Sequence, residues 1–154
     1  MKLQFGLFVL LFSIVTVVHS QAFTYDTTRS LYAEGDTGEV FDFTIKFVTL
    51  DSSDVTFKWK TIENTLGFSW SYSLCDYTNC YFNIPDSGTM TPILTSDFQS
   101  GVAGFFNLLV STDAVARNGV LKLYVYNSND ISEGDTIRFE IKTNGMATDT
   151  TDTA

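Results

Sequence analysis

Histidine is nearly absent from this chain of 154 residues, since His19 is the only one, and cysteine occurs only twice. Residues 1–20 have the form of a secretory signal peptide, with a positive start at Met1-Lys2 and an apolar run from Phe5 to Val18. Cleavage after this segment removes His19. The mature chain then has no histidine to act as general base in Ser-His-Asp or Cys-His catalysis, so we expect no enzyme.

Long apolar segments and basic residues are also scarce. The run in the signal peptide is shorter than the roughly 20 residues of a membrane-spanning helix, and we expect no transmembrane segment in the mature chain. Nine Lys and Arg stand against 18 Asp and Glu, a net charge of −9, or −10 once Lys2 is removed. An acidic surface repels phosphate backbones, so we expect no nucleic acid partner.

The mature chain has the size of a single domain, which we place at residues 21–143. Residues 144–154 are rich in Thr and Asp, and Met146 is their one large apolar side chain. Such a segment has little to bury, and we predict a flexible tail.

Alternation of large apolar and polar residues is the main signal of the domain, and it is typical of strands with one buried face. It runs through Phe41–Phe47, Val55–Lys60, Phe68–Leu74 and Thr136–Lys142. More continuously apolar runs, Phe105–Val110 and Val120–Tyr126, are typical of central strands, and we expect a turn at Thr112–Arg117 between them.

About seven to nine strands without connecting helices predict an all-β fold, a single antiparallel two-sheet β-sandwich. A closed barrel is the alternative. Alternation also predicts the core side chains: Phe41, Phe43, Ile45, Phe47, Val55, Phe57, Trp59, Trp70 and Phe139.

The two cysteines, Cys75 and Cys80, lie close together between two predicted strands. In an exported protein such a pair usually forms a disulfide. A zinc site would need further Cys or His ligands, and a redox pair usually has Cys-x-x-Cys spacing. We therefore predict a structural disulfide and no cofactor.

Three stretches carry a family resemblance: Phe57-Lys58-Trp59-Lys60, Phe68-Ser69-Trp70 and Cys75-Asp76-Tyr77-Thr78-Asn79-Cys80-Tyr81. They resemble an exported Ig-like domain common in Bacteroidota, of the type often found in type IX-secreted proteins. Residues 118–123 and 135–139 are similar to its two closing strands, and the resemblance covers most of residues 40–142. It implies an Ig-like β-sandwich and a secreted or periplasmic location, and it brings no catalytic residues.

Carboxylates are abundant, but most lie in turns, where solvent makes general-acid chemistry difficult. Calcium is the most plausible metal, because it prefers oxygen ligands. The oxygen-rich loops are Glu34, Asp36 and Glu39, and Asn127, Asn129, Asp130, Glu133 and Asp135. Neither has EF-hand spacing, so Asp130, Glu133 and Asp135 are weak calcium candidates and we predict no metal site.

Tyrosines are the candidate ligand-binding residues. Alternation places Tyr124 and Tyr126 on the outer face of a strand, and Tyr77 and Tyr81 flank the disulfide loop. Exposed aromatic rings with hydroxyl tips suit sugar or peptide recognition. Ordinary cross-strand aromatic pairing is the alternative.

These features favour an exported, non-catalytic domain with a binding or structural role in the cell envelope or extracellular space. Its partner would be an envelope protein or a glycan. Two alternatives stay open: a self-associating or assembly subunit of an envelope complex that uses an unpaired sheet edge, and a carbohydrate-binding module that uses surface tyrosines.

Overall fold

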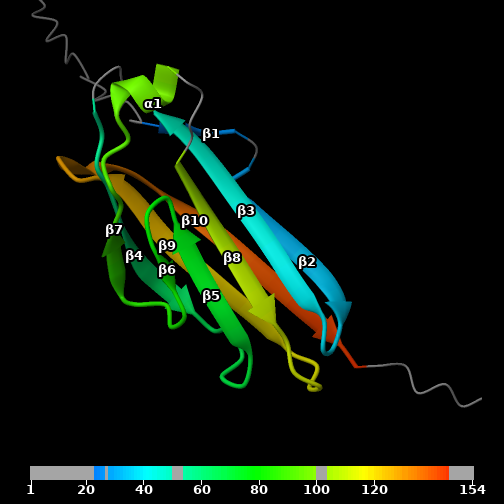
Figure 1. The fold of residues 1–154 in the computed structure, drawn as a ribbon. Helices are drawn as coiled ribbons and strands as arrows, with labels where there is room; N and C mark the ends of the chain where they lie inside the picture. The colour runs from blue at the N-terminus through cyan, green and yellow to red at the C-terminus, as the bar shows by residue number, and fades with distance from the viewer. Residues whose placement is uncertain (1–22, 27, 50–53, 100–103, 146–154) are drawn as a thin grey trace, which may run out of the picture.

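The computed structural model describes residues 23–26, 28–49, 54–99 and 104–145, so the predicted signal peptide and residues 146–154 of the tail lie outside it. The described residues form two five-stranded sheets and the short helix α1 (Thr95–Gln99) (Figure 1). Sheet A contains, in spatial order, β1 (Phe23–Tyr25), β3 (Val40–Thr49), β8 (Gly104–Ser111), β5 (Ser71–Asp76) and β6 (Cys80–Tyr81). Sheet B contains β2 (Ser30–Asp36), β10 (Asp130–Asn144), β9 (Asn118–Asn127), β4 (Phe57–Asn64) and β7 (Ser87–Thr89).

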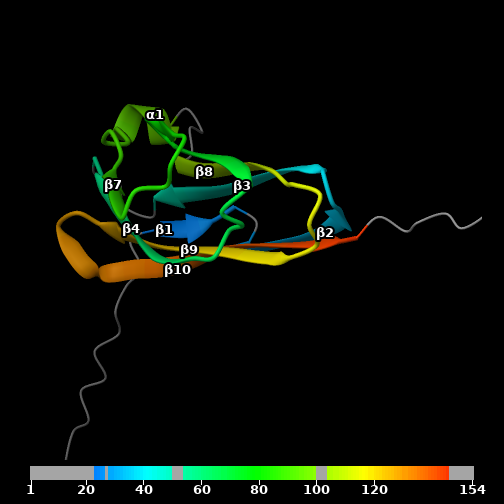
Figure 2. The same cartoon turned by 90° about the horizontal axis from the view of Figure 1, so that it is seen from below.

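The sheets lie face to face, with β3 and β8 in one layer and β9 and β10 in the other (Figure 2). Because side chains alternate along each strand, the apolar members of every pair meet between the layers. All nine predicted core side chains are buried, and Phe57, Trp59 and Phe139 have no exposed surface. The predicted Ig-like β-sandwich is confirmed. The closed barrel is wrong, because two separate sheets are present, each with its own edge strands.

One strand pairing departs from the predicted antiparallel sheets. β2 runs parallel to β10, with Ser30 beside Arg138 and Asp36 beside Asn144. The N-terminal chain forms β1 at the edge of sheet A and then crosses to the edge of sheet B. The direction of β2 is therefore set by that crossing and not by a hairpin with β10. Sheet B contains this parallel pair together with antiparallel ones.

The alternating run Phe68–Leu74 does not form a strand over its whole length. Trp70 is buried, but Phe68 is 93% exposed. The Trp70 N–H donates to the carbonyl of Gly67 at 2.9 Å, so a turn precedes β5, which begins only at Ser71. The period of two does not continue through a turn, and the aromatic side chain is left in solvent.

The connections at the end opposite α1 position the surface described below. The predicted turn at Thr112–Arg117 is confirmed, and it lies with the β2–β3 turn and the end of β10 (Figure 1). Within the described ranges, no helix has the length and apolar character needed to cross a membrane.

Candidate binding surface

The predicted disulfide is present. Cys75 on β5 and Cys80 on β6 are joined across a tight hairpin, with their Cα atoms 4.0 Å apart. Both residues lie outside the core, at the edge of sheet A. The bond therefore fixes the short strand β6 against β5.

A buried carboxylate inside this hairpin connects the two sheets. Asp76 is 2% exposed, and its Oδ2 accepts a hydrogen bond at 2.9 Å from the indole Nε1 of Trp59 on sheet B. Its Oδ1 accepts the backbone N–H groups of Thr78 and Asn79 at 2.9 and 2.8 Å. Each carboxylate oxygen is thus engaged, as burial of a charged group requires. Sequence reasoning missed this role, because a turn aspartate has no signal of burial.

The tyrosines beside the disulfide pack against other rings. The Tyr81 ring lies 5.6 Å from that of Trp59, and the Tyr77 ring lies 6.3 Å from that of Phe105 on the outer face of sheet A. Burial, and then the charge of Asp76, raise the pKa of the Tyr81 hydroxyl. Both side chains are half-buried.

The second predicted pair lies on the other sheet. Tyr124 and Tyr126 are half-buried on the outer face of sheet B, with their rings stacked at 5.7 Å. The Tyr124 hydroxyl donates to the carbonyl of Ile131 at 2.6 Å, and the ammonium of Lys60 lies 5.4 Å from the Tyr124 ring centroid. The four candidate tyrosines therefore do not form one surface, and much of Tyr124 is already engaged by its neighbours.

The weak calcium candidates use their oxygens on different partners. Asp135 pairs with Arg29 at 2.8 Å, and Glu133 accepts the side-chain amide of Asn127 at 3.2 Å. Asp130 accepts two hydrogen bonds from Ser132. Among the described residues, no three His, Cys, Asp or Glu side chains converge on a point that could hold a metal.

The other oxygen-rich loop contains a carboxylate held by nearby donors. Glu34 accepts hydrogen bonds from Lys142 and Tyr32, each at 2.6 Å, and from Asn144 at 2.8 Å. These contacts, the Lys142 bond foremost, lower the pKa of Glu34 to about 2. Its function here is to join β2 to β10.

A surface that sequence reasoning did not identify lies at the β5 edge of sheet A and extends onto the outer face of that sheet. Two adjoining hollows share Ser71, Tyr72 and Phe82. The first, of about 280 Å³, is lined by Val40, Ser71, Tyr72, Ser73, Phe82, Leu109 and Ser111. The second, of about 370 Å³, is lined by Phe68, Trp70, Ser71, Tyr72, Phe82 and Asn83. We refer to the residues lining both as the Phe82 surface.

Strand register explains how these residues come together. Ser111 on β8 lies opposite Val40 on β3 and opposite Ser71 on β5, while Leu109 lies opposite Ser73. Ser71, Ser73 and Ser111 therefore lie beside the larger side chains of Val40 and Leu109 on this face. Phe82 is 82% exposed and Val40 is 62% exposed. Clusters of exposed large apolar side chains mark interaction sites more often than single ones do.

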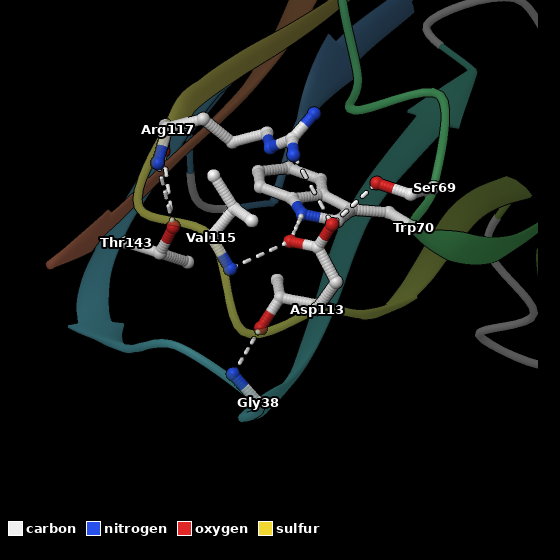
Figure 3. A network of polar contacts seen from close by, with 8 residues as sticks. Gly38, Ser69, Trp70, Asp113, Val115, Arg117 and Thr143 are labelled. Carbon is white, nitrogen blue, oxygen red and sulfur yellow. Dashed lines mark hydrogen bonds and ion pairs between the residues drawn. The ribbon is translucent and has the colours of Figure 1, made fainter. Parts of the chain in front are cut away.

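A polar network supports one end of the Phe82 surface (Figure 3). The Asp113 carboxylate accepts hydrogen bonds from the Ser69 hydroxyl, from the Trp70 indole at 3.2 Å and from the Val115 N–H at 3.1 Å. It also pairs with Arg117 at 3.1 Å. These contacts, the Ser69 bond foremost, hold the pKa of Asp113 below its ordinary value.

Among the aromatic rings whose exposure the structure describes, the most exposed one, Phe68, also contacts this network. The Arg117 guanidinium that Asp113 holds lies 5.4 Å from the centroid of Phe68. A cation over a ring face is attractive, so it restricts the ring although solvent surrounds the side chain. Gly67-Phe68 was the available sequence signal, since a glycine next to an alternating segment often marks a turn.

Comparisons with known proteins identify the fold. No protein-family model matches the chain, and no curated protein matches it either. Among solved structures, the N-terminal domain of PorA is similar with a TM-score of 0.54 and 11% identity, covering 77% of this chain and 89% of that one. A PapD-like domain of human CEP192 has a TM-score of 0.44 and 8% identity, covering 90% and 96%. At 11% identity the likeness to the PorA domain shows the fold alone, in agreement with the two-sheet Ig-like β-sandwich.

Proposed function

We propose that this chain is an exported, non-catalytic Ig-like domain that binds a protein partner in the cell envelope or extracellular space through the Phe82 surface. The observation that carries the proposal is the exposure of Phe68 and Phe82 at two adjoining hollows. Aromatic side chains are enriched in protein interfaces and often carry a large share of the binding energy.

Export and the absence of catalysis are parts of the same proposal. The signal-peptide pattern, the disulfide and the resemblance to exported domains of Bacteroidota support a secreted or periplasmic location. The loss of His19 with the signal peptide supports a function without enzymatic turnover. Carbohydrate binding has less support, because neighbours already engage Tyr124.

The proposal is tested by affinity capture from the envelope fraction of the native organism, using the mature protein tagged at its C-terminal tail. Wild type is compared with Phe82→Ser. The matched control is Ile131→Ser, since Ile131 is 55% exposed and lies at the β9–β10 turn, in sheet B.

Loss of a central interface aromatic typically weakens binding by about 2 kcal/mol or more, roughly thirtyfold. We therefore expect a stoichiometric partner with wild type and with Ile131→Ser, and none with Phe82→Ser. Equal capture by all three proteins would place the partner on another surface and refute the proposal.

A further inference from the structure

The edge of sheet A is open along half of β5. β6 pairs with β5 only at Leu74 and Cys75, so within the described residues Ser71–Ser73 have a neighbouring strand, β8, on one side only. The chain leaves this edge at Phe82. The hollow of about 370 Å³ is lined by Ser71 and Tyr72 of β5 and by Phe82 and Asn83 of the departing segment.

Backbone alternation shows which groups face the open edge. The Asp76 N–H donates to the carbonyl of Asn79 at 2.8 Å, so Asp76 directs its backbone groups toward β6. The short Cα separation of Cys75 and Cys80, 4.0 Å, is that of a pair without mutual hydrogen bonds, which agrees with this alternation. In a strand, the backbone N–H and C=O groups of every second residue point to the same side, so those of Leu74 and Tyr72 point the same way as those of Asp76. The N–H and C=O of Tyr72 lie beyond the end of β6 and therefore face the hollow.

The lining of the edge is uncharged. None of the residues that line the two hollows is Asp, Glu, Lys or Arg, although 27 of the 154 residues are. Edge strands are usually protected from pairing by charged side chains, proline or bulges. An edge without these features, flanked by exposed Phe68 and Phe82, is suited to accept another strand.

Two occupants from this chain itself fit poorly. The tail after Gly145 is Met-Ala-Thr-Asp-Thr-Thr-Asp-Thr-Ala, which offers one large apolar side chain to an apolar hollow. A second copy would bring a second mature net charge of −10 against the first, and like charges oppose association.

We infer that the Phe82 surface binds an extended, uncharged segment of a partner protein, which adds to sheet A as a strand beside β5. Its backbone pairs with the N–H and C=O of Tyr72, and its alternate apolar side chains enter the two hollows. Strand addition takes affinity from main-chain hydrogen bonds and specificity from side-chain pockets. The inference rests on the proposed function and names the class of its partner.

The test is selection of peptides from a random display library on the immobilised mature protein, followed by synthesis of an enriched peptide. A twin peptide carries N-methyl groups at alternate residues, which removes the donors of one strand edge and keeps every side chain. Binding of both is measured, together with exchange of the Tyr72 amide by NMR.

We expect the enriched peptides to carry apolar side chains at alternate residues and to slow exchange of the Tyr72 amide. N-methylation at alternate residues can be placed on either of the two sets of positions, and in one of these two registers it should lower affinity about tenfold. Phe82→Ser should weaken the same peptides, and Ile131→Ser should not. Failure to enrich any peptide overturns the inference, as does binding that leaves Tyr72 exchange and both N-methyl registers unaffected.

Two further results separate this inference from the proposed function. Tyr72 protection that rises with protein concentration and without peptide identifies a second copy as the occupant, and overturns the inference. In the second result, Phe82→Ser abolishes capture of the envelope partner, but an excess of the selected peptide does not displace that partner. This result supports the proposed function and overturns strand addition alone.

Discussion

The hydrogen bond between Trp59 and Asp76 should be one of the largest single polar contributions to stability. Asp76→Ala leaves the Trp59 indole N–H without an acceptor at a side chain that is 0% exposed. An unsatisfied buried donor costs about 1–3 kcal/mol. The N–H groups of Thr78 and Asn79 are only partly buried and can reach water, so their loss adds about 0.5–1 kcal/mol each.

The sum is a decrease of about 3 kcal/mol in the free energy of unfolding, against a typical total of roughly 5–15 kcal/mol. Urea denaturation with the disulfide intact measures it. The matched control is Asp42→Ala, because Asp42 is exposed on sheet A and its carboxylate accepts a hydrogen bond from the side-chain amide of Asn107 at 2.6 Å. That substitution should change stability by less than about 0.5 kcal/mol.

A double-mutant cycle isolates the contact between the sheets. Trp59→Phe removes the indole N–H along with some ring volume, and combining it with Asp76→Ala should recover about 1–2 kcal/mol of coupling. Coupling below about 0.5 kcal/mol would refute the reasoning, because it would mean that the carboxylate stabilises the hairpin without connecting it to sheet B.

Three further outcomes follow from particular contacts. Gly88→Ala would place a Cβ against the Trp59 ring, too close for both to keep their positions, and should lower stability by about 1–3 kcal/mol in urea. Gly145→Ala, with nothing within 4 Å, should be neutral. Folding lowers the pKa of Glu34 from 4.5 to about 2, so the stability that its carboxylate contributes is complete above pH 4.5 and is lost as the pH falls toward 2. Between pH 4.5 and 2, the melting temperature of Glu34→Gln should therefore fall less than that of wild type. Reduction of the disulfide should lower stability by about 2 kcal/mol without unfolding the domain, checked by urea denaturation with and without reductant.

The sandwich and its core could be predicted because alternation reports burial directly. Phe41 to Phe47 and Ile137 to Ile141 point inward at every second residue, and each of these side chains is buried. Hydrophobic periodicity depends only on neighbours along a strand, which a sequence displays. The parallel pairing of β2 with β10 depends on where the chain crosses between sheets, which periodicity does not encode.

The Phe82 surface could not be predicted for the same physical reason. Whether Phe68 is buried depends on the turn at Gly67, and the alternating pattern continues through that turn as if it were a strand. Phe82 follows a two-residue strand that is too short to show a period. Alternation places Tyr124 and Tyr126 on an outer face, as the structure does, but the ring that each tyrosine contacts depends on strand pairing, which periodicity does not encode.

The contacts that hold β6 against one half of the β5 edge also determine where the other half begins. The disulfide and the Asp76 hydrogen bonds hold β6 in place as far as Tyr81, and the chain can leave the edge only at Phe82. Beside the second hollow, the Arg117 guanidinium lies 5.4 Å from the ring centroid of Phe68, and this attraction favours one position of that ring. The backbone before Phe82 and the Phe68 ring are therefore ordered before a partner segment arrives, which lowers the entropy lost on binding. This favours a specific strand over general adhesion to apolar surfaces.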